Sequence, residues 1–189
     1  MEPRSRRWRR PATSIAIFLL VSIGILTLYR YQSANVESGS QPAAAQRIVD
    51  LTNAARAAHS LAPVSLDRGL TLAAEEYSQA MAERDWFSHA GPDGSTIDLR
   101  IQAAGYRGWT YLGENLARGY GPMDPSDIVD GWMNSAAHRD NILSSNLREI
   151  GVGCYVRSDP DLRFWCVQDF GARGRQLLGV SRLHNGPDG

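Results

Sequence analysis

The sequence predicts an α+β domain in which the helices come first and a β-hairpin comes last. Two segments, 46–58 and 67–82, place apolar residues at spacings of three and four, which is the period of an amphipathic helix. Two later segments, 149–156 and 163–170, alternate between two faces as strands do, and the turn-forming stretch 158–161 separates them. The chain has 189 residues, of which 43% are hydrophobic, and this suffices for one folded domain with attached segments.

Local signals indicate where the expected elements begin and end. Asp67 is suited to cap the second helix, because its carboxylate can accept the free N–H groups of the first turn. A short helix over 97–104 should stop at Gly105, and a third substantial helix is expected over 125–135. Between these two helices, Gly113-Glu114-Asn115 is typical of a turn.

The N-terminal segment predicts export of the domain. Residues 1–10 hold five arginines, and residues 11–29 are nineteen uncharged, mostly apolar residues. At about 1.5 Å per helical residue this run nearly spans the ~30 Å hydrocarbon core of a bilayer, and the arginines favour a cytoplasmic N-terminus. We predict an uncleaved signal anchor, and so a single-pass protein of the cell membrane with its domain outside. A cleaved signal peptide is the alternative, and it would make the domain secreted.

Composition sets the remaining boundaries. Residues 30–45 are small, polar and aperiodic, which predicts a flexible linker between the membrane segment and the domain. The domain is expected over 46–173. Residues 174–189 are expected to form a poorly ordered tail.

Charge and residue usage argue against several function classes. Residues 1–10 carry five arginines and one glutamate, a net charge of +4, so the rest of the chain carries 15 arginines against 19 acids, a net charge of −4. The folded part has no positive excess to attract phosphates, and we expect no nucleic-acid binding. The absence of lysine excludes Schiff-base chemistry and a Walker-type phosphate loop. The chain also lacks the Gly-x-Ser-x-Gly and Gly-x-Gly-x-x-Gly motifs of common hydrolases and dinucleotide-binding proteins.

The two cysteines of the chain lie in the two predicted strands. Folding the hairpin about Pro160 places Cys154 directly opposite Cys166. Facing residues of a non-hydrogen-bonded antiparallel pair lie about 4.5 Å apart at Cα, a separation that a disulfide can span. In an exported domain this predicts a Cys154–Cys166 bridge, and two buried free thiols are the alternative.

Three motifs stand in a fixed order along the chain. They are Ser88-His89, then Gly113-Glu114-Asn115, then a run from Trp132 to Gly153 that reads Trp-x-x-Ser-x-x-His-Arg-x-Asn-Ile-Leu and later Glu-Ile-Gly-Val-Gly. His138 of this run is expected on a polar turn that follows a helix. As an ordered set, these motifs resemble the bacterial branch of the CAP superfamily (SCP/TAPS), the cysteine-rich secretory, antigen 5 and pathogenesis-related proteins. The resemblance covers roughly residues 46–171.

The resemblance implies a three-layer α-β-α sandwich with a mainly antiparallel sheet and two helices ahead of the first site histidine. It also implies a cleft that contains His89, Glu114 and His138. Ser135 belongs to this cleft too, at a place where many eukaryotic members carry a second acid. Since two imidazoles and a carboxylate match the ligands of an open zinc site, His89 and His138 are the candidate ligands of a divalent metal such as zinc.

Other interpretations of these residues stay open. The two histidines could be hydrogen-bonded structural residues, and Glu114 could hold a loop by accepting backbone N–H bonds. Ser135 lies three residues before His138, so the pair could act as nucleophile and base if both share one helical face. Asn141 is expected to close the turn after His138.

Three functions follow as hypotheses. The first is a membrane-anchored extracellular domain that binds a small apolar ligand such as a lipid, a divalent metal or a cell-envelope component in its cleft, as the resemblance implies. The second is a metal-assisted hydrolase of peptides or cell-wall material, with Glu114 and His138 as general acid and base. The third is a structural or adhesive domain whose cleft is inert.

Overall fold

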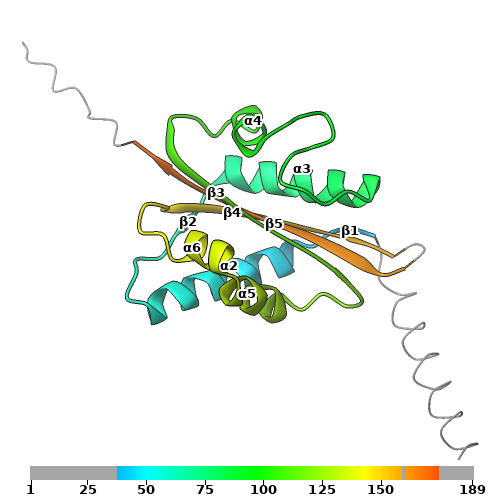
Figure 1. Cartoon of the computed structure of the whole chain (residues 1–189), viewed down its shortest axis with the longest axis horizontal. Helices are drawn as coiled ribbons and strands as arrows, with labels where there is room; N and C mark the ends of the chain where they lie inside the picture. The colour runs from blue at the N-terminus through cyan, green and yellow to red at the C-terminus, as the bar shows by residue number, and fades with distance from the viewer. Residues whose placement is uncertain (1–37, 159–160, 175–189) are drawn as a thin grey trace, which may run out of the picture.

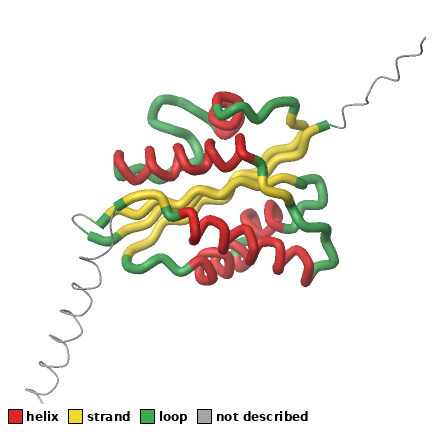
Figure 2. Tube along the Cα trace, turned by 180° about the vertical axis from the view of Figure 1, so that it is seen from behind, coloured by secondary structure: helices red, strands yellow, loops and turns green. Residues whose placement is uncertain are grey.

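One sheet lies between two layers of helices in the computed structural model, which describes residues 38–158 and 161–174. Helices α3 and α4 cover one face of the sheet, and α2, α5 and α6 cover the other (Figure 1), as the view from behind also shows (Figure 2). This confirms the predicted α-β-α sandwich. The elements are α2 (Pro42–Ala58), α3 (Arg68–Arg84), α4 (Ile97–Ala103), α5 (Pro125–Asn134), α6 (Ala136–Ile142), β1 (Gly39–Ser40), β2 (Ser65–Leu66), β3 (Trp109–Tyr120), β4 (Glu149–Arg157) and β5 (Arg163–Arg173).

The sheet is mainly antiparallel, as predicted. Its order is β1-β4-β5-β3, and only β2 joins it in parallel, at one end of β4. Because β1 and β2 both pair with β4, strand β3 forms the opposite, open edge of the sheet. The β4–β5 register places Cys154 opposite Cys166, and the two sulfur atoms form the predicted disulfide.

Strand β4 packs directly under α3, and two glycines of the Glu-Ile-Gly-Val-Gly motif make this possible. A Cβ atom on Gly151 would lie 2.1 Å from the backbone of Leu70, and one on Gly153 would lie 2.3 Å from the backbone nitrogen of Glu75. Such distances are too short for any other residue, so these glycines allow the helix to lie against bare backbone. Asp67 caps α3 as predicted, because its side chain accepts the N–H groups of the first turn.

Three predicted boundaries or elements were wrong. Helix α2 begins at Pro42 and β1 pairs with β4, so the predicted linker contributes its last residues to the fold. Proline suits the first turn of a helix because its φ is already helical and the missing N–H would have no partner there. The turn-like stretch 113–115 lies inside β3, where pairing with β5 overrides its weak strand propensity. His138 lies on the short helix α6 rather than on a turn.

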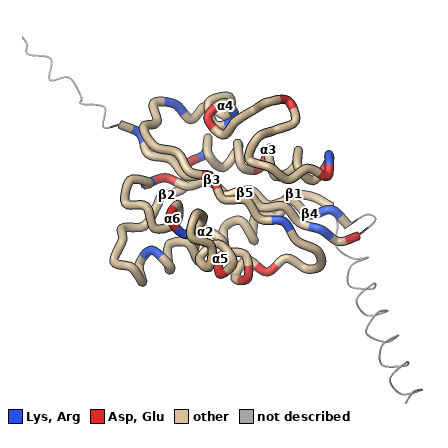
Figure 3. Tube along the Cα trace, in the orientation of Figure 1, with Lys and Arg blue, Asp and Glu red and all other residues tan. Residues whose placement is uncertain are grey.

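The predicted membrane segment, residues 11–29, and the predicted tail lie outside the described residues. Within residues 38–158 and 161–174, no helix is long and apolar enough to cross a bilayer. The arginines and acids of the same residues are interspersed along the chain rather than gathered on separate faces (Figure 3).

Candidate functional site

His89 and Glu114 are brought together from a loop and a strand. Nδ1 of His89 lies 2.6 Å from Oε1 of Glu114, and Nη2 of Arg100 lies 2.5 Å from Oε2. The Glu114 side chain is only 4% exposed, whereas that of His89 is 63% exposed. Glu114 is therefore a buried carboxylate held between two donors, and His89 presents the rest of its ring to solvent.

Arg100 and Tyr77 hold the loop that carries His89. Arg100 donates to the carbonyl oxygens of His89 and Ser95, and its guanidinium lies 3.6 Å from the centre of the Tyr77 ring. Tyr77 in turn donates its hydroxyl to the carbonyl oxygen of Ser88. Burial raises the pKa of Tyr77, which keeps this hydroxyl a donor. The position of His89 thus depends on residues from α3 and α4.

On the other face of the sheet, a buried polar network ties α6 to β3. Asn115 donates to the carbonyl oxygen of His138 and to Oε1 of Gln168, while Asn141 donates to Oδ1 of Asn115 and to the carbonyl oxygen of Glu114. A Cβ atom on Gly113 would lie 2.8 Å from Oδ1 of Asn141, so glycine is needed for this close approach. Asn115 and Asn141 therefore position His138 and the backbone of Glu114.

Asn141 and Trp132 also block part of the open edge of β3. The side-chain amide of Asn141 donates a hydrogen bond to the carbonyl oxygen of Glu114. The indole N–H of Trp132 donates to the carbonyl oxygen of Leu116 at 3.0 Å. An unpaired edge strand is a template for pairing with other chains, and occupied carbonyls remove that template. The edge next to the two histidines is thus open to ligands but capped against strand addition.

The end of α6 is anchored by a buried arginine from α2. Arg56 is 3% exposed, and its guanidinium donates to the carbonyl oxygens of Ala62, Ile142, Ser144 and Leu147. Two of these acceptors belong to the loop after α6. Burial lowers the pKa of Arg56, as expected for a cation whose hydrogen-bond partners are neutral carbonyls.

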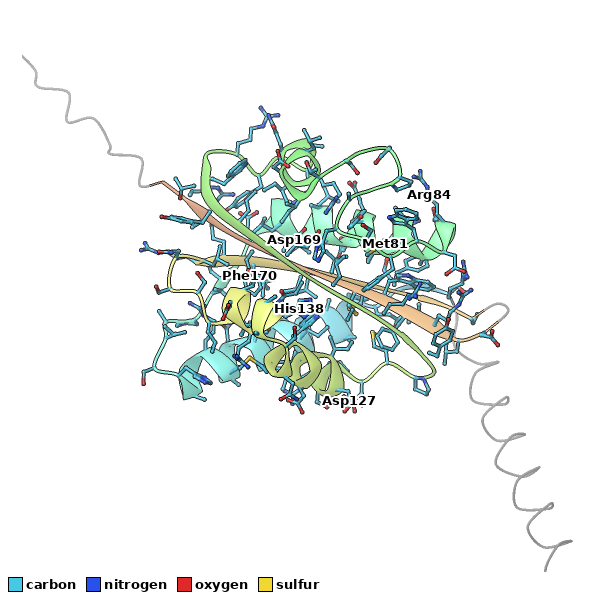
Figure 4. The ribbon with its side chains drawn as sticks, in the orientation of Figure 1. Met81, Arg84, Asp127, His138, Asp169 and Phe170 are labelled. Carbon is cyan, nitrogen blue, oxygen red and sulfur yellow. A yellow bond between two sulfur atoms is a disulfide. The ribbon has the colours of Figure 1, made fainter. Side chains whose placement is uncertain are left out.

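His138 lies on α6, in the helical layer that covers the lower face of the sheet in Figure 4, and it is half-buried. Burial lowers the pKa of His138, and the charge of His89 lowers it further. No hydrogen bond joins the Ser135 hydroxyl to the His138 ring within the described residues, although both residues border the same groove.

That groove, which we call the edge groove, has a volume of about 420 Å³ and runs along β3 between α5 and the loop at Phe87. Its apolar wall comes from Phe87, Leu116, Ile128, Trp132 and Phe164. Ser135 and His138 lie at one side of it, and Arg118 and Asp127 add charges. A concave apolar surface of this size with a few polar groups is typical of a small-molecule site.

The predicted metal ligands do not form a complete metal site as folded. Across residues 38–158 and 161–174, no group of three or more His, Cys, Asp or Glu side chains is arranged to hold a metal ion. Both carboxylate oxygens of Glu114 already accept hydrogen bonds from His89 and Arg100. Two imidazoles alone are one ligand short of an open zinc site, so we derive no chemical step through a metal.

Sequence patterns alone did not reveal two residues of this site. Arg100 lies in the short helix predicted over 97–104, for which the sequence suggested no functional role. Asp169 sits on β5 directly opposite Glu114, and it is completely buried. An acid inside the predicted strand 163–170 was the one signal that could have identified it, because a buried acid needs a partner.

The chain matches known proteins over this region. A family model described as the Cysteine-rich secretory protein family (CAP) matches residues 49–170. The protein YkwD of Bacillus subtilis is 39% identical over 127 residues, which make up 67% of this chain and 46% of YkwD. The membrane protein YlbC of the same organism is 34% identical over 113 residues, or 60% of this chain and 32% of YlbC. The chain thus matches less than half the length of either relative.

Solved structures share the fold. An extracellular protein containing an SCP domain from Bacillus anthracis has a TM-score of 0.59 and 29% identity, covering 71% of this chain and 41% of that one. An outer surface protein from Borrelia burgdorferi has a TM-score of 0.64 and 22% identity, covering 73% of this chain and 98% of that one.

Proposed function

This chain belongs to the CAP family of cysteine-rich secretory proteins, and we propose that its domain binds a small, largely apolar ligand in the edge groove. The observation that carries this proposal is the set of apolar side chains that line the groove together with His138. The ligand is an aliphatic chain with one polar head group. The chain packs on Phe87 and Phe164, and the head group meets the imidazole of His138.

Charge within the groove favours an acidic head group. Arg118 borders the groove, and its guanidinium lies 5.2 Å from the centre of the Phe87 ring. A carboxylate or phosphate head group can pair with this cation. Asp127 also borders the groove, and its negative charge repels an anion placed beside it. Fatty acids and the acidic lipids of an envelope have this chemistry.

Decanoate binding to a fragment of residues 38–174, measured by calorimetry, tests this proposal. We expect saturable binding to one site, and Phe87→Ala should weaken it by about tenfold, since a partly buried aromatic contact contributes on the order of 1.5 kcal/mol. Phe87 is 41% exposed, so its removal should leave the fold intact. Leu66→Ala is the matched control, because Leu66 is 53% exposed and lies on β2, across the sheet. Equal binding by both variants and the wild type would refute the edge groove as the site.

Export of the domain is part of this proposal. One relative is named as an extracellular protein and another as a membrane protein, and both names support a location at or beyond the membrane. A single-pass anchor over residues 11–29 remains a prediction. Protease added outside intact cells should remove the domain from the membrane fraction if the anchor is uncleaved.

A second candidate function is hydrolysis, and the contact between His89 and Glu114 favours it. A carboxylate that accepts from Nδ1 of an imidazole leaves Nε2 free to take a proton from an attacking water. In this arrangement Glu114 orients His89, and His138 is the second group in the cleft. Turnover of peptide or cell-wall fragments should fall about a hundredfold in Glu114→Gln. An unchanged rate in that variant would rule out this role.

A further inference from the structure

Asp169 is a buried acid that forms no salt bridge with any of the described residues. It is 0% exposed and lies on β5 opposite Glu114 of β3. Asp169 and its neighbour Phe170 point to opposite faces of the sheet, with Asp169 toward the layer of α3 and α4 (Figure 4). Among the described residues, no donor reaches either carboxylate oxygen of Asp169. An ionised carboxylate in such a place costs several kcal/mol unless it is paired.

Among the described residues, the hydrogen-bond donors of the titratable groups near Asp169 that have a partner are bonded to other residues. Arg100 of α4 gives its terminal nitrogens to Glu114, His89 and Ser95. Its Nε atom is buried and has no acceptor, so Arg100 makes no hydrogen bond to Asp169. Tyr77 of α3 donates its hydroxyl to Ser88. The remaining neighbour is Glu114 itself, which lies directly opposite Asp169 in the β3–β5 ladder, so both side chains are on the same face of the sheet.

Two carboxylates have no hydrogen to share, so this pair forms a hydrogen bond only when one of them is protonated. We propose that Asp169 is a neutral carboxylic acid that donates its proton to Glu114, so that the pair holds one proton and one negative charge. Glu114 is the member that keeps the charge, because His89 and Arg100 both donate to it. Burial raises the pKa of Asp169 well above its ordinary value, and the charge of Glu114 raises it further, while Arg100 opposes the shift.

This proton makes Asp169 a positioning residue for His89. With three donors around it, Glu114 has one orientation, and it accepts from Nδ1 of His89. The ring then carries its hydrogen on Nδ1 and directs Nε2 away from Glu114. This role is the same whether the edge groove binds a ligand or the cleft performs hydrolysis, so failure of either function leaves it untouched.

Infrared spectroscopy of the full-length protein in detergent micelles tests the proposal directly. We expect the C=O band of a buried carboxylic acid at neutral pH. The band should shift when aspartate is labelled with ¹³C, and it should vanish in Asp169→Asn. Asp50→Asn, at an exposed position of α2, is the control that should keep the band. Absence of the band in the wild type, its survival in Asp169→Asn, or a shift with labelled glutamate instead would overturn the proposal.

A second measurement tests the positioning of His89. Asparagine is neutral and keeps an N–H donor for Glu114, whereas leucine has none, so Asp169→Asn should retain the Nδ1–H tautomer of His89 in nitrogen NMR spectra. Asp169→Leu should lose that single tautomer and melt at a lower temperature. A mixture of tautomers in Asp169→Asn would contradict the donor role. Should Asp169→Leu fail to fold, the comparison of wild type with Asp169→Asn still decides the question.

Discussion

Nδ1 of His89 lies 2.6 Å from Oε1 of Glu114, although 25 positions separate the two residues in sequence. One sits on a loop and the other on the open edge strand, and Arg100 contacts both of them. The two residues of this contact differ in exposure. Glu114 is buried and fixed, and His89 is exposed and oriented. His138 approaches from α6, on the other side of the strand, and the charge of His89 adds to burial in lowering the pKa of His138.

That coupling can be measured by NMR titration of the four histidines. His138 should titrate below the ordinary value of 6.5. His89→Ala should raise the pKa of His138 only part of the way back, because burial is the larger cause and remains. His59→Ala is the control, since His59 follows the end of α2 and its ring contacts the carbonyl oxygen of Ala55. An unchanged pKa of His138 in His89→Ala would show that the two rings do not share a cleft.

The same shift predicts how stability depends on pH. The folded pKa of His138 lies below the unfolded one, so the unfolded chain binds more protons between the two values. The contribution of His138 to the free energy of unfolding is therefore fully present above pH 6.5 and is lost as pH falls through the folded pKa. Urea titrations from pH 7 to pH 5 should show this loss in the wild type and a smaller one in His138→Gln. Parallel curves for the two proteins would contradict it.

Arg56 should be among the most sensitive positions of the fold. Arg56→Met removes the donor of four carbonyl oxygens, and leaving such groups unpaired costs about 1–3 kcal/mol each before the loop relaxes. We expect the free energy of unfolding to fall by about 3 kcal/mol or more, measured by urea denaturation. Arg47→Met, at an exposed position of the same helix, should change it by less than about 0.5 kcal/mol. Equal effects of the two substitutions would show that Arg56 does not anchor α6.

The disulfide should stabilise the hairpin at the centre of the sheet. The bridge closes a loop with a sequence separation of 12, for which the entropic contribution is about 3 kcal/mol. Reduction should therefore lower the urea midpoint of the wild type. A Cys154→Ala, Cys166→Ala double variant should be insensitive to reductant. If the reductant destabilises both proteins alike, its effect does not come from this bond.

Zinc calorimetry tests the metal hypothesis against the fold. With Glu114 engaged by His89 and Arg100, and no third ligand among the described residues, we expect no stoichiometric binding. The wild type, His89→Ala and His138→Ala should give the same baseline. Tight binding in the wild type that disappears in both variants would show that the loop carrying His89 rearranges to complete a site. That result would support the hypothesis of a metal-assisted hydrolase.

The sequence by itself determined the type of most elements, since these depend on periodicity and capping. The apolar stripe and Asp67 predicted α3, and the alternation on both sides of residues 158–161 predicted the hairpin and the register of Cys154 with Cys166. These signals are local, or link residues through one short turn, so a single sequence carries them. The ordered motifs predicted the family, and the family resemblance in turn implied the candidate site residues His89, Glu114, Ser135 and His138.

Only the tertiary structure decided what surrounds those residues. Strand β3 has weak local propensity at 113–115, and it forms because β5 offers a long partner. Arg100 donates to Glu114 from α4, and Asp169 lies opposite Glu114 on β5. Arg56 holds the end of α6 from a helix 86 residues earlier in the chain. Hydrogen bonding and burial act through space between distant segments, and no local pattern in the sequence records which segments will meet.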